Sequence, residues 1–354
     1  MDFAIPSDAV VRVALMTGLL LLGLTLLILL NVLLLGLSSA RQARRDHGFR
    51  EVWQPVMAAA AIGDIPRELP PLHWADHQRF LLLWNRMQQS VRGHARDHLN
   101  TLLQRTGMDR MARLHLEAGS TRARMIAINT FRHLRPEDTA SRLLRLAREA
   151  PAPVAITAAR TVAGIDNGQH TATLVAIMLH RRDWSSTHSL DIFRAAPTEQ
   201  AATALLPAFR HGSPRERERL LPLLECVPPT QRAAALRAFL REHPDDPLTA
   251  PALDLLAVSR DPADLELMRG LVAHRQAHVR AIAVWALAKI GGGNSDFQRV
   301  QALLSDRNWH VRQSAAAGLV VLPGVEREQL HRLVDTLDDA YGQRALARAL
   351  EATP

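Results

Sequence analysis

An apolar pattern recurs eight times along this chain, at intervals of 31 or 32 residues. The copies start at Ala123, Val154, Ser185, Glu216, Leu248, Val279, Val311 and Gly342. Four positions later the residues are mostly small: Ala127, Ala158, Ser189, Leu220, Ala252, Ala283, Ala315 and Leu346. Eight positions later all are apolar: Phe131, Val162, Phe193, Leu224, Leu256, Leu287, Leu319 and Leu350. These spacings lie on one face of an α-helix, and a fixed period of a few tens of residues indicates a solenoid. We therefore expect stacked helical units that work by presenting a surface.

Each unit is predicted to contain two helices joined by a short turn. Ser213-Pro214 and Asp261-Pro262 each place an N-cap residue before a proline at the first helical position. The glycines at 291–293 stop a helix. One such pair cannot bury its apolar stripe alone, whereas stacked pairs can, so the predicted core runs along the array.

The two clearest units, residues 271–290 and 303–322, carry the motif that identifies them. The second contains a turn aspartate, then Val-Arg, then a small residue and a leucine: Asp306, Val311, Arg312, Ala315 and Leu319. This pattern resembles the HEAT-repeat family, in the short form of bacterial lyase-type repeats, and by period the resemblance covers roughly residues 108–354. It implies an all-α, right-handed α-solenoid of two-helix HEAT-like repeats.

An arginine follows the first pattern position in four units: Arg124, Arg217, Arg280 and Arg312. The resemblance implies that Asp306 hydrogen-bonds Arg312, six residues later, and ties units together. The other three arginines have no acid six residues earlier: the residues there are Ala118, His211 and His274. A structural role and a ligand-binding role both stay open for them. We take Arg124, Arg217 and Arg280 as candidate partner-binding residues.

Residues 13–37 are 25 consecutive residues without a charge, and 14 of them are Leu. As a helix they would span about 37 Å, against a hydrocarbon core of about 30 Å. The alternative is a signal peptide cleaved near residues 38–40. However, the apolar run is longer than a signal core and the preceding segment is not basic. We therefore predict one uncleaved transmembrane helix.

Arginines flank this segment unevenly. Only Arg12 precedes it, whereas Arg41, Arg44, Arg45 and Arg50 follow it closely. The positive-inside rule then predicts a single-pass protein of the bacterial inner membrane, with its N-terminus outside and its solenoid in the cytoplasm. The four following arginines are candidate lipid-surface residues because anionic headgroups attract cations beside the bilayer.

Small and polar residues interrupt the leucines of the span. Gly18, Thr25 and Gly36 form a stripe of smaller side chains, and Asn31 could add a polar contact. Small residues let a second helix approach closely in a membrane. These four residues are candidate intramembrane packing residues, with a chance pattern as the alternative.

Five segments are expected in all. Residues 1–12 form a short N-terminal segment, 13–37 the transmembrane helix, and 38–72 a basic juxtamembrane segment and linker. Residues 73–106 form an atypical helical N-terminal cap unit, and 107–354 the repeat solenoid. The charge is concentrated beside the span: residues 38–134 hold 15 Arg and 8 acids, hence +7 of a total of +8. A dedicated nucleic-acid solenoid would instead place its excess along the binding face, so we do not expect nucleic acid as a partner.

Catalytic chemistry is not evident in the sequence. Cys226 is the only cysteine, and no phosphate-binding, nucleophile-elbow or zinc-protease motif occurs. His73/His77 and His94/His98 have metal-ligand spacing, but a solvated helix face explains them more simply. We expect no enzyme activity, no cofactor and no metal.

The expected function is a membrane-anchored protein-interaction scaffold that presents its solenoid at the cytoplasmic face. The resemblance to anchored HEAT-repeat proteins implies a protein partner, and an accessory role beside a membrane enzyme such as a polysaccharide glycosyltransferase. One alternative is a lyase- or DNA-glycosylase-like HEAT-repeat enzyme. Another is an anionic-lipid or nucleic-acid binder that uses the Arg-rich residues 38–134.

Overall fold

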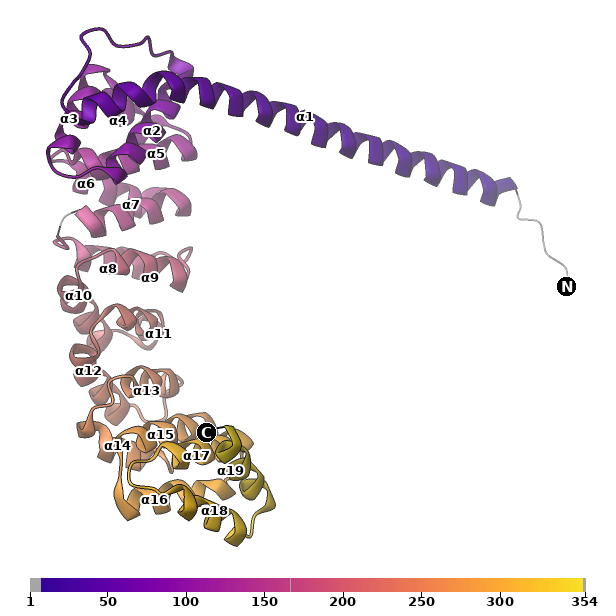
Figure 1. The fold of residues 1–354 in the computed structure, drawn as a ribbon, viewed down its shortest axis with the longest axis vertical. Helices are drawn as coiled ribbons and strands as arrows, with labels where there is room; N and C mark the ends of the chain where they lie inside the picture. The colour runs from indigo at the N-terminus through magenta and orange to yellow at the C-terminus, as the bar shows by residue number, and fades with distance from the viewer. Residues whose placement is uncertain (1–7, 166, 353–354) are drawn as a thin grey trace. The chain divides into compact units, whose positions relative to one another are not determined.

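The computed structural model describes residues 8–165 and 167–352, and within them every regular element is a helix (Figure 1). The chain divides into two compact units, Met1–Pro136 and Glu137–Pro354. The all-α class predicted from the sequence is therefore confirmed for the described residues.

The first unit begins with one long helix, α1 (Asp8–Ala61). A 3-10 turn and four shorter helices follow: η1 (Trp74–Asp76), α2 (His77–Ser90), α3 (His94–Arg105), α4 (Met108–Ala118) and α5 (Thr121–Leu134). The last turns of α1 pack against α2 and α3. Trp53, Met57 and Ala60 are buried there, and the Trp53 ring meets Phe80 edge-on at 4.9 Å between centroids.

The helix α1 extends further than the sequence analysis indicated. Residues 38–72 were expected to be a basic segment and linker, but α1 continues to Ala61 and only residues 62–73 are irregular. The physical reason is the spacing of Trp53, Met57 and Ala60, which places all three on one helix face. Burial of that face against α2 and α3 stabilises the helix in spite of Pro55.

The first half of α1 contains an apolar window, Met16–Leu33, with a mean hydropathy of 2.4 and none of its residues buried. Its length and composition suffice to cross a membrane. A membrane span and an N-terminal signal sequence share these two properties.

The second unit is a run of short helices. Its first half holds α6 (Thr139–Glu149), α7 (Ala152–Ile165), α8 (Thr171–His180), α9 (Ser186–Arg194), α10 (Thr198–His211), α11 (Pro214–Leu220), η2 (Leu221–Cys226) and α12 (Pro229–Glu242). Its second half holds α13 (Thr249–Ala257), η3 (Pro262–Asp264), α14 (Leu265–Leu271), α15 (Ala277–Ile290), α16 (Gly293–Ala302), η4 (Leu303–Ser305), α17 (Trp309–Val321), α18 (Arg327–Thr336) and α19 (Ala340–Ala352).

These helices form two layers, with every second helix in the same layer (Figure 1). In one layer α7 packs on α9, α13 on α15, α15 on α17, and α17 on α19. In the other layer α10 packs on both α8 and α12. The apolar side chains between consecutive helix pairs form a core that runs along the unit, as expected of a solenoid.

The predicted register of the repeat is confirmed. All eight residues at the third pattern position are buried, and so are all eight residues at the second position. At the first position Ser185, Glu216 and Leu248 are not buried, because all three lie at helix starts: Ser185 caps α9, Glu216 completes a capping box with Ser213, and Leu248 precedes α13. Side chains at caps point toward the free N–H groups of the first turn and not into the core.

Two glycines lie where neighbouring repeats of the last part of the chain approach closely. A Cβ added at Gly342 would lie 2.6 Å from the carbonyl oxygen of Leu304, and one at Gly318 would lie 3.0 Å from the Cβ of Ala288. These distances explain the preference for small residues in the layer that contains α15, α17 and α19.

Truncation of the buried Leu287 to Ala should lower the free energy of unfolding by about 2–5 kcal/mol, because it leaves a cavity between α15 and its neighbours. Thermal melting of the full chain in detergent, followed by far-ultraviolet circular dichroism, measures the loss. The matched control is Val258→Ala, since Val258 is 62% exposed and should change stability little. Equal melting of the parent and the Leu287 variant would show that the register is wrong.

Candidate functional site

A buried ion pair joins two consecutive repeats. The Arg280 guanidinium donates from Nε and Nη2 to the two carboxylate oxygens of Asp306, at 2.8 Å each. Its Nη1 donates to the carbonyl oxygens of His274 and Arg275. The side chains of Arg280 and Asp306 are 8% and 9% exposed. The pair therefore ties α15 to the turn before α17, and all but a small part of Arg280 is withdrawn from solvent.

Arg280 has no acid six residues earlier in the sequence, but the structure pairs it with Asp306, which lies 26 residues later, in the next repeat. Arg312 does hydrogen-bond Asp306, but it binds the backbone and not the carboxylate: Arg312 Nη1 donates to the Asp306 carbonyl oxygen at 2.7 Å. Burial acts to raise the pKa of Asp306, but the bonds from Arg280 and the Asn308 N–H outweigh it and hold that pKa below its usual value.

A second series of ion pairs runs through the other layer. Arg237 donates to Asp264 and Asp261. Arg269 donates from Nε and Nη2 to Asp296, at 2.8 and 2.9 Å, and these hydrogen bonds lower the pKa of the buried Asp296 carboxyl. Arg237 and Asp264 are 27 residues apart, as are Arg269 and Asp296, and the two pairs are one 32-residue period apart. This arginine–aspartate series was not predicted from the sequence, although its spacing is visible there.

The other two candidate arginines are also engaged locally. Arg124 Nη2 donates to the carbonyl oxygen of Glu117 at 2.8 Å. Arg217 donates to the carbonyl oxygens of Phe209 and Arg210, and its Nη1 lies 2.9 Å from the His243 ring nitrogen. These contacts hold adjacent helices and turns together without an aspartate. Partner binding by Arg124, Arg217 and Arg280 stays a prediction, and each of them has a structural role.

Exposed aromatic side chains gather on the last two repeats. Trp309 is 55% exposed and Tyr341 65%, at the first turns of α17 and α19, which pack against each other. The Trp309 ring lies on His310 at 3.7 Å between centroids, and the Arg312 guanidinium lies 5.2 Å from the centre of the Tyr341 ring. We call these four residues the C-terminal aromatic surface. Aromatic residues make up only 4% of the chain, so their exposure on neighbouring repeats calls for an explanation beyond packing.

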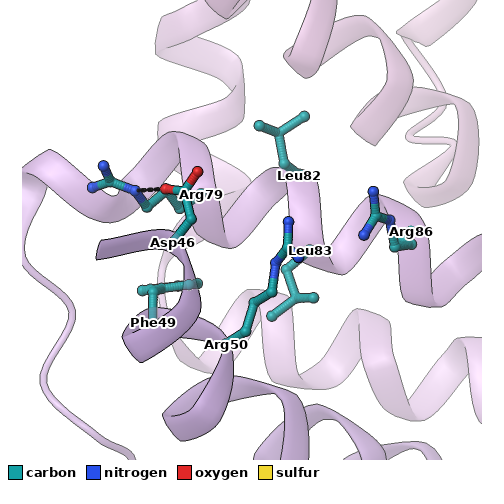
Figure 2. Close-up of a pocket in the computed structure, with 7 residues that line it drawn as sticks. All are labelled: Asp46, Phe49, Arg50, Arg79, Leu82, Leu83 and Arg86. Atoms are coloured by element: carbon teal, nitrogen blue, oxygen red, sulfur yellow. Dashed lines mark hydrogen bonds and ion pairs between the residues drawn. The ribbon is translucent and has the colours of Figure 1, made fainter. Parts of the chain in front are cut away.

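A charged cavity lies beside the last part of α1. It has a volume of about 150 Å³ and is walled by Phe49, Leu82, Leu83, Arg50 and Arg86 (Figure 2). At one side Asp46 accepts a bond from Arg79 Nε at 2.5 Å. Of the candidate lipid-surface residues, Arg44, Arg45 and Arg50 are exposed on α1. Arg41 lies in α1, but its side chain is outside the described residues.

The candidate packing residues of the span lie within α1. Beyond its chain neighbours and the nearby backbone of α1, no atom lies within 4 Å of a Cβ built at Gly18. Asn31 is exposed, and the Thr25 hydroxyl donates to the Leu21 carbonyl at 2.7 Å. The surroundings of Gly36 are outside the described residues. A packing role for these four residues stays a prediction.

The described residues contain no group of three or more His, Cys, Asp or Glu side chains arranged to hold a metal ion. His98, from one of the two spaced pairs, lies 3.4 Å from the Ala61 carbonyl oxygen through Nδ1. Cys226 is half-buried, and burial raises the pKa of its thiol, which keeps it protonated and unreactive.

Comparison with known protein families gives one match. Residues 233–320 match the family described as HEAT repeats. The matched segment runs from α12 to α17 and includes Arg237, Arg269 and the Arg280–Asp306 pair. No curated protein matches the chain.

Replacement of Arg280 by Ala should lower the free energy of unfolding by about 3–5 kcal/mol, because it leaves the Asp306 carboxylate buried without its partner. Chemical denaturation of the full chain in detergent measures the effect. Arg312→Ala is the matched control, since Arg312 is half-buried and donates to a backbone carbonyl, and it should cost less. An Arg280 variant no less stable than the Arg312 variant would contradict a structural role for the pair.

Proposed function

We propose that this chain, whose residues 233–320 are HEAT repeats, is a membrane-anchored scaffold that binds a protein partner at the cytoplasmic face. The observation that carries the proposal is the C-terminal aromatic surface: Trp309, His310 and Tyr341 lie exposed, and Arg312 half-buried, on repeats whose core is otherwise filled. HEAT repeats generally mediate protein interactions, so a protein is the first class of partner to consider.

The C-terminal aromatic surface has the composition of a protein-binding site. Tryptophan, tyrosine and arginine are enriched among the few residues that dominate the binding energy of interfaces. Arg312 is held by the Asp306 carbonyl and in turn lies over Tyr341, which restrains both side chains before a partner arrives. The mixture of rings and cations favours a partner segment with apolar and acidic side chains.

The form of α1 supports an uncleaved anchor over a signal sequence. The helix runs without a break from the apolar window to Ala61, where Trp53 and Met57 are buried against α2 and α3. Cleavage near residue 40 would fall inside this helix. The excess of arginine after the span favours a cytoplasmic location for everything that follows it.

A binding role fits the polar residues of the repeats better than catalysis. The buried carboxylates of Asp264, Asp296 and Asp306 are each bonded to an arginine, so none of them is poised as a general acid or base. Because the scaffold is anchored, we propose a membrane enzyme as the partner, with a polysaccharide glycosyltransferase as the class that the sequence resemblance implies. Contacts through Gly18 and Thr25 in the bilayer would add to those of the repeats.

The proposed topology predicts that a reporter fused after Pro354 is active only if it works in the cytoplasm. A fluorescent protein that folds in the cytoplasm should be bright at this position, and alkaline phosphatase should be inactive. Alkaline phosphatase activity from the same fusion would place the repeats on the other side of the membrane. A mature N-terminus near residue 41 would exclude the anchor.

The proposed partner surface predicts that Trp309→Ala with Tyr341→Ala weakens partner binding by about 2 kcal/mol or more, the usual cost of truncating interface hot spots. The measurement is the yield of the crosslinked complex from membranes that contain the full-length protein. Val321→Ala is the matched control, because Val321 is 43% exposed at the other end of α17. Equal yields from the double variant, the control and the parent would remove this surface from the proposal, provided that all three melt alike.

A further inference from the structure

One end of the first unit lies beside the part of α1 that follows the predicted span. With the hydrocarbon segment ending at residue 37, a helical rise of 1.5 Å puts Gln42 about 7 Å beyond its edge and Asp46 about 13 Å beyond. The headgroup layer on each side of a bilayer is about 5–8 Å thick. Gln42 is therefore at headgroup depth, and Asp46 is just outside it.

Trp74 lies against this part of α1. It begins η1, directly after the irregular residues 62–73, and it lines a cavity of about 400 Å³ together with Gln42, Asp46 and Arg122. A neighbouring cavity of about 450 Å³ places Trp74 beside Arg45. The Trp74 side chain is 83% exposed, although the indole is the most costly of the large side chains to leave in water.

The charges at this end of the unit are mostly positive. Two carboxylates at this end are neutralised by one arginine: Asp46 and Asp76 both accept hydrogen bonds from the Arg79 guanidinium, at 2.5 and 2.6 Å. On α1 itself, His47 Nε2 lies 3.2 Å from a carboxylate oxygen of Glu51. Three further arginines at this end, Arg44, Arg45 and Arg122, are exposed. No ion pair joins any of these three to an acid among the residues that the structure describes.

We propose that Trp74, with Arg44, Arg45 and Arg122, forms a second contact between this protein and the membrane, on a bilayer surface of anionic phospholipid. The indole occupies the headgroup layer, where amphipathic rings are favoured, and the three guanidinium groups bind lipid phosphates. The occupant is a bilayer and not a protein because the site is continuous with the span and begins at headgroup depth, with Gln42. This inference rests on the proposed span and adds a fixed orientation to it. An anchor alone leaves α1 and the helices packed on it free to tilt together in the bilayer, whereas a second attachment restrains that tilt.

The test uses the full-length protein reconstituted into vesicles of phosphatidylcholine and phosphatidylglycerol whose acyl chains carry bromine near the headgroup. Bromine quenches tryptophan fluorescence at short range. Of the six tryptophans, Trp53, Trp84 and Trp184 are buried in the protein. Trp74→Phe should therefore reduce the quenched fraction at least about twofold, because Trp74 is the indole at headgroup depth. Trp309→Phe is the matched control, since it removes another exposed tryptophan.

A second arm tests the charges. Replacement of Arg44, Arg45 and Arg122 by Gln should reduce quenching of Trp74, and so should vesicles of phosphatidylcholine alone or high salt, since screening weakens attraction to anionic lipid. The proposal is overturned if Trp74→Phe lowers the quenched fraction no more than Trp309→Phe does. It is also overturned if quenching is the same with and without phosphatidylglycerol, or if Trp74 is protected only when a protein partner is added.

A separate measurement shows whether the apolar segment of α1 spans the membrane at all. Vesicle flotation after extraction with alkaline carbonate retains only an inserted protein. Retention without quenching of Trp74 leaves the anchor in place and refutes the second contact. Loss of the protein from the vesicles in carbonate refutes the span itself, and with it the basis of the second contact.

Discussion

The burial of one helix face in each repeat against the helix of the next repeat is the constraint on which the second unit depends. Leu287 on α15 and Leu319 on α17 occupy equivalent positions and are both fully buried, with Ala283 and Ala315 one turn earlier. Small residues at the earlier turn let the helices approach, and the leucines then fill the space between them. Since each repeat contacts only its neighbours, no single residue organises the whole array, and a loss of packing in one repeat weakens its neighbours first.

Apolar faces alone would let neighbouring helices slide, and the arginine–aspartate pairs supply the missing register. Arg237, Arg269 and Arg280 each reach from one repeat into the next and bind a carboxylate there. A guanidinium that bonds both carboxylate oxygens accepts only one relative position of the two groups. Burial of such a pair contributes little net stability, because desolvation offsets the attraction, but separation of the two partners is costly. The pairs therefore select one alignment of the repeats.

The pairing of the buried carboxylates with arginines also bears on function. Because the buried carboxylates of the repeats are occupied, exposed groups have to do the binding. On the repeats these are Trp309, His310 and Tyr341, together with the half-buried Arg312, and in the first unit they are Trp74 and three arginines. Both surfaces combine aromatic rings with cations, yet their settings differ: one is carried by packed repeats, and the other lies beside α1 in the first unit.

The sequence by itself determined the helical class, the 31- or 32-residue period, the buried register and an apolar segment long enough to cross a membrane. These follow from local properties, since helical spacing and hydropathy can be read along the chain without knowledge of its neighbours. The tertiary structure alone decided that α1 continues to Ala61, that Asp306 pairs with Arg280 of the preceding repeat, and that Trp74 lies beside Gln42. Each of these depends on which turns and faces meet across residues far apart in the chain. The period of the arginine–aspartate pairs lies between the two cases: its spacing is present in the sequence, but only the stacking of repeats shows that residues 27 positions apart are in contact.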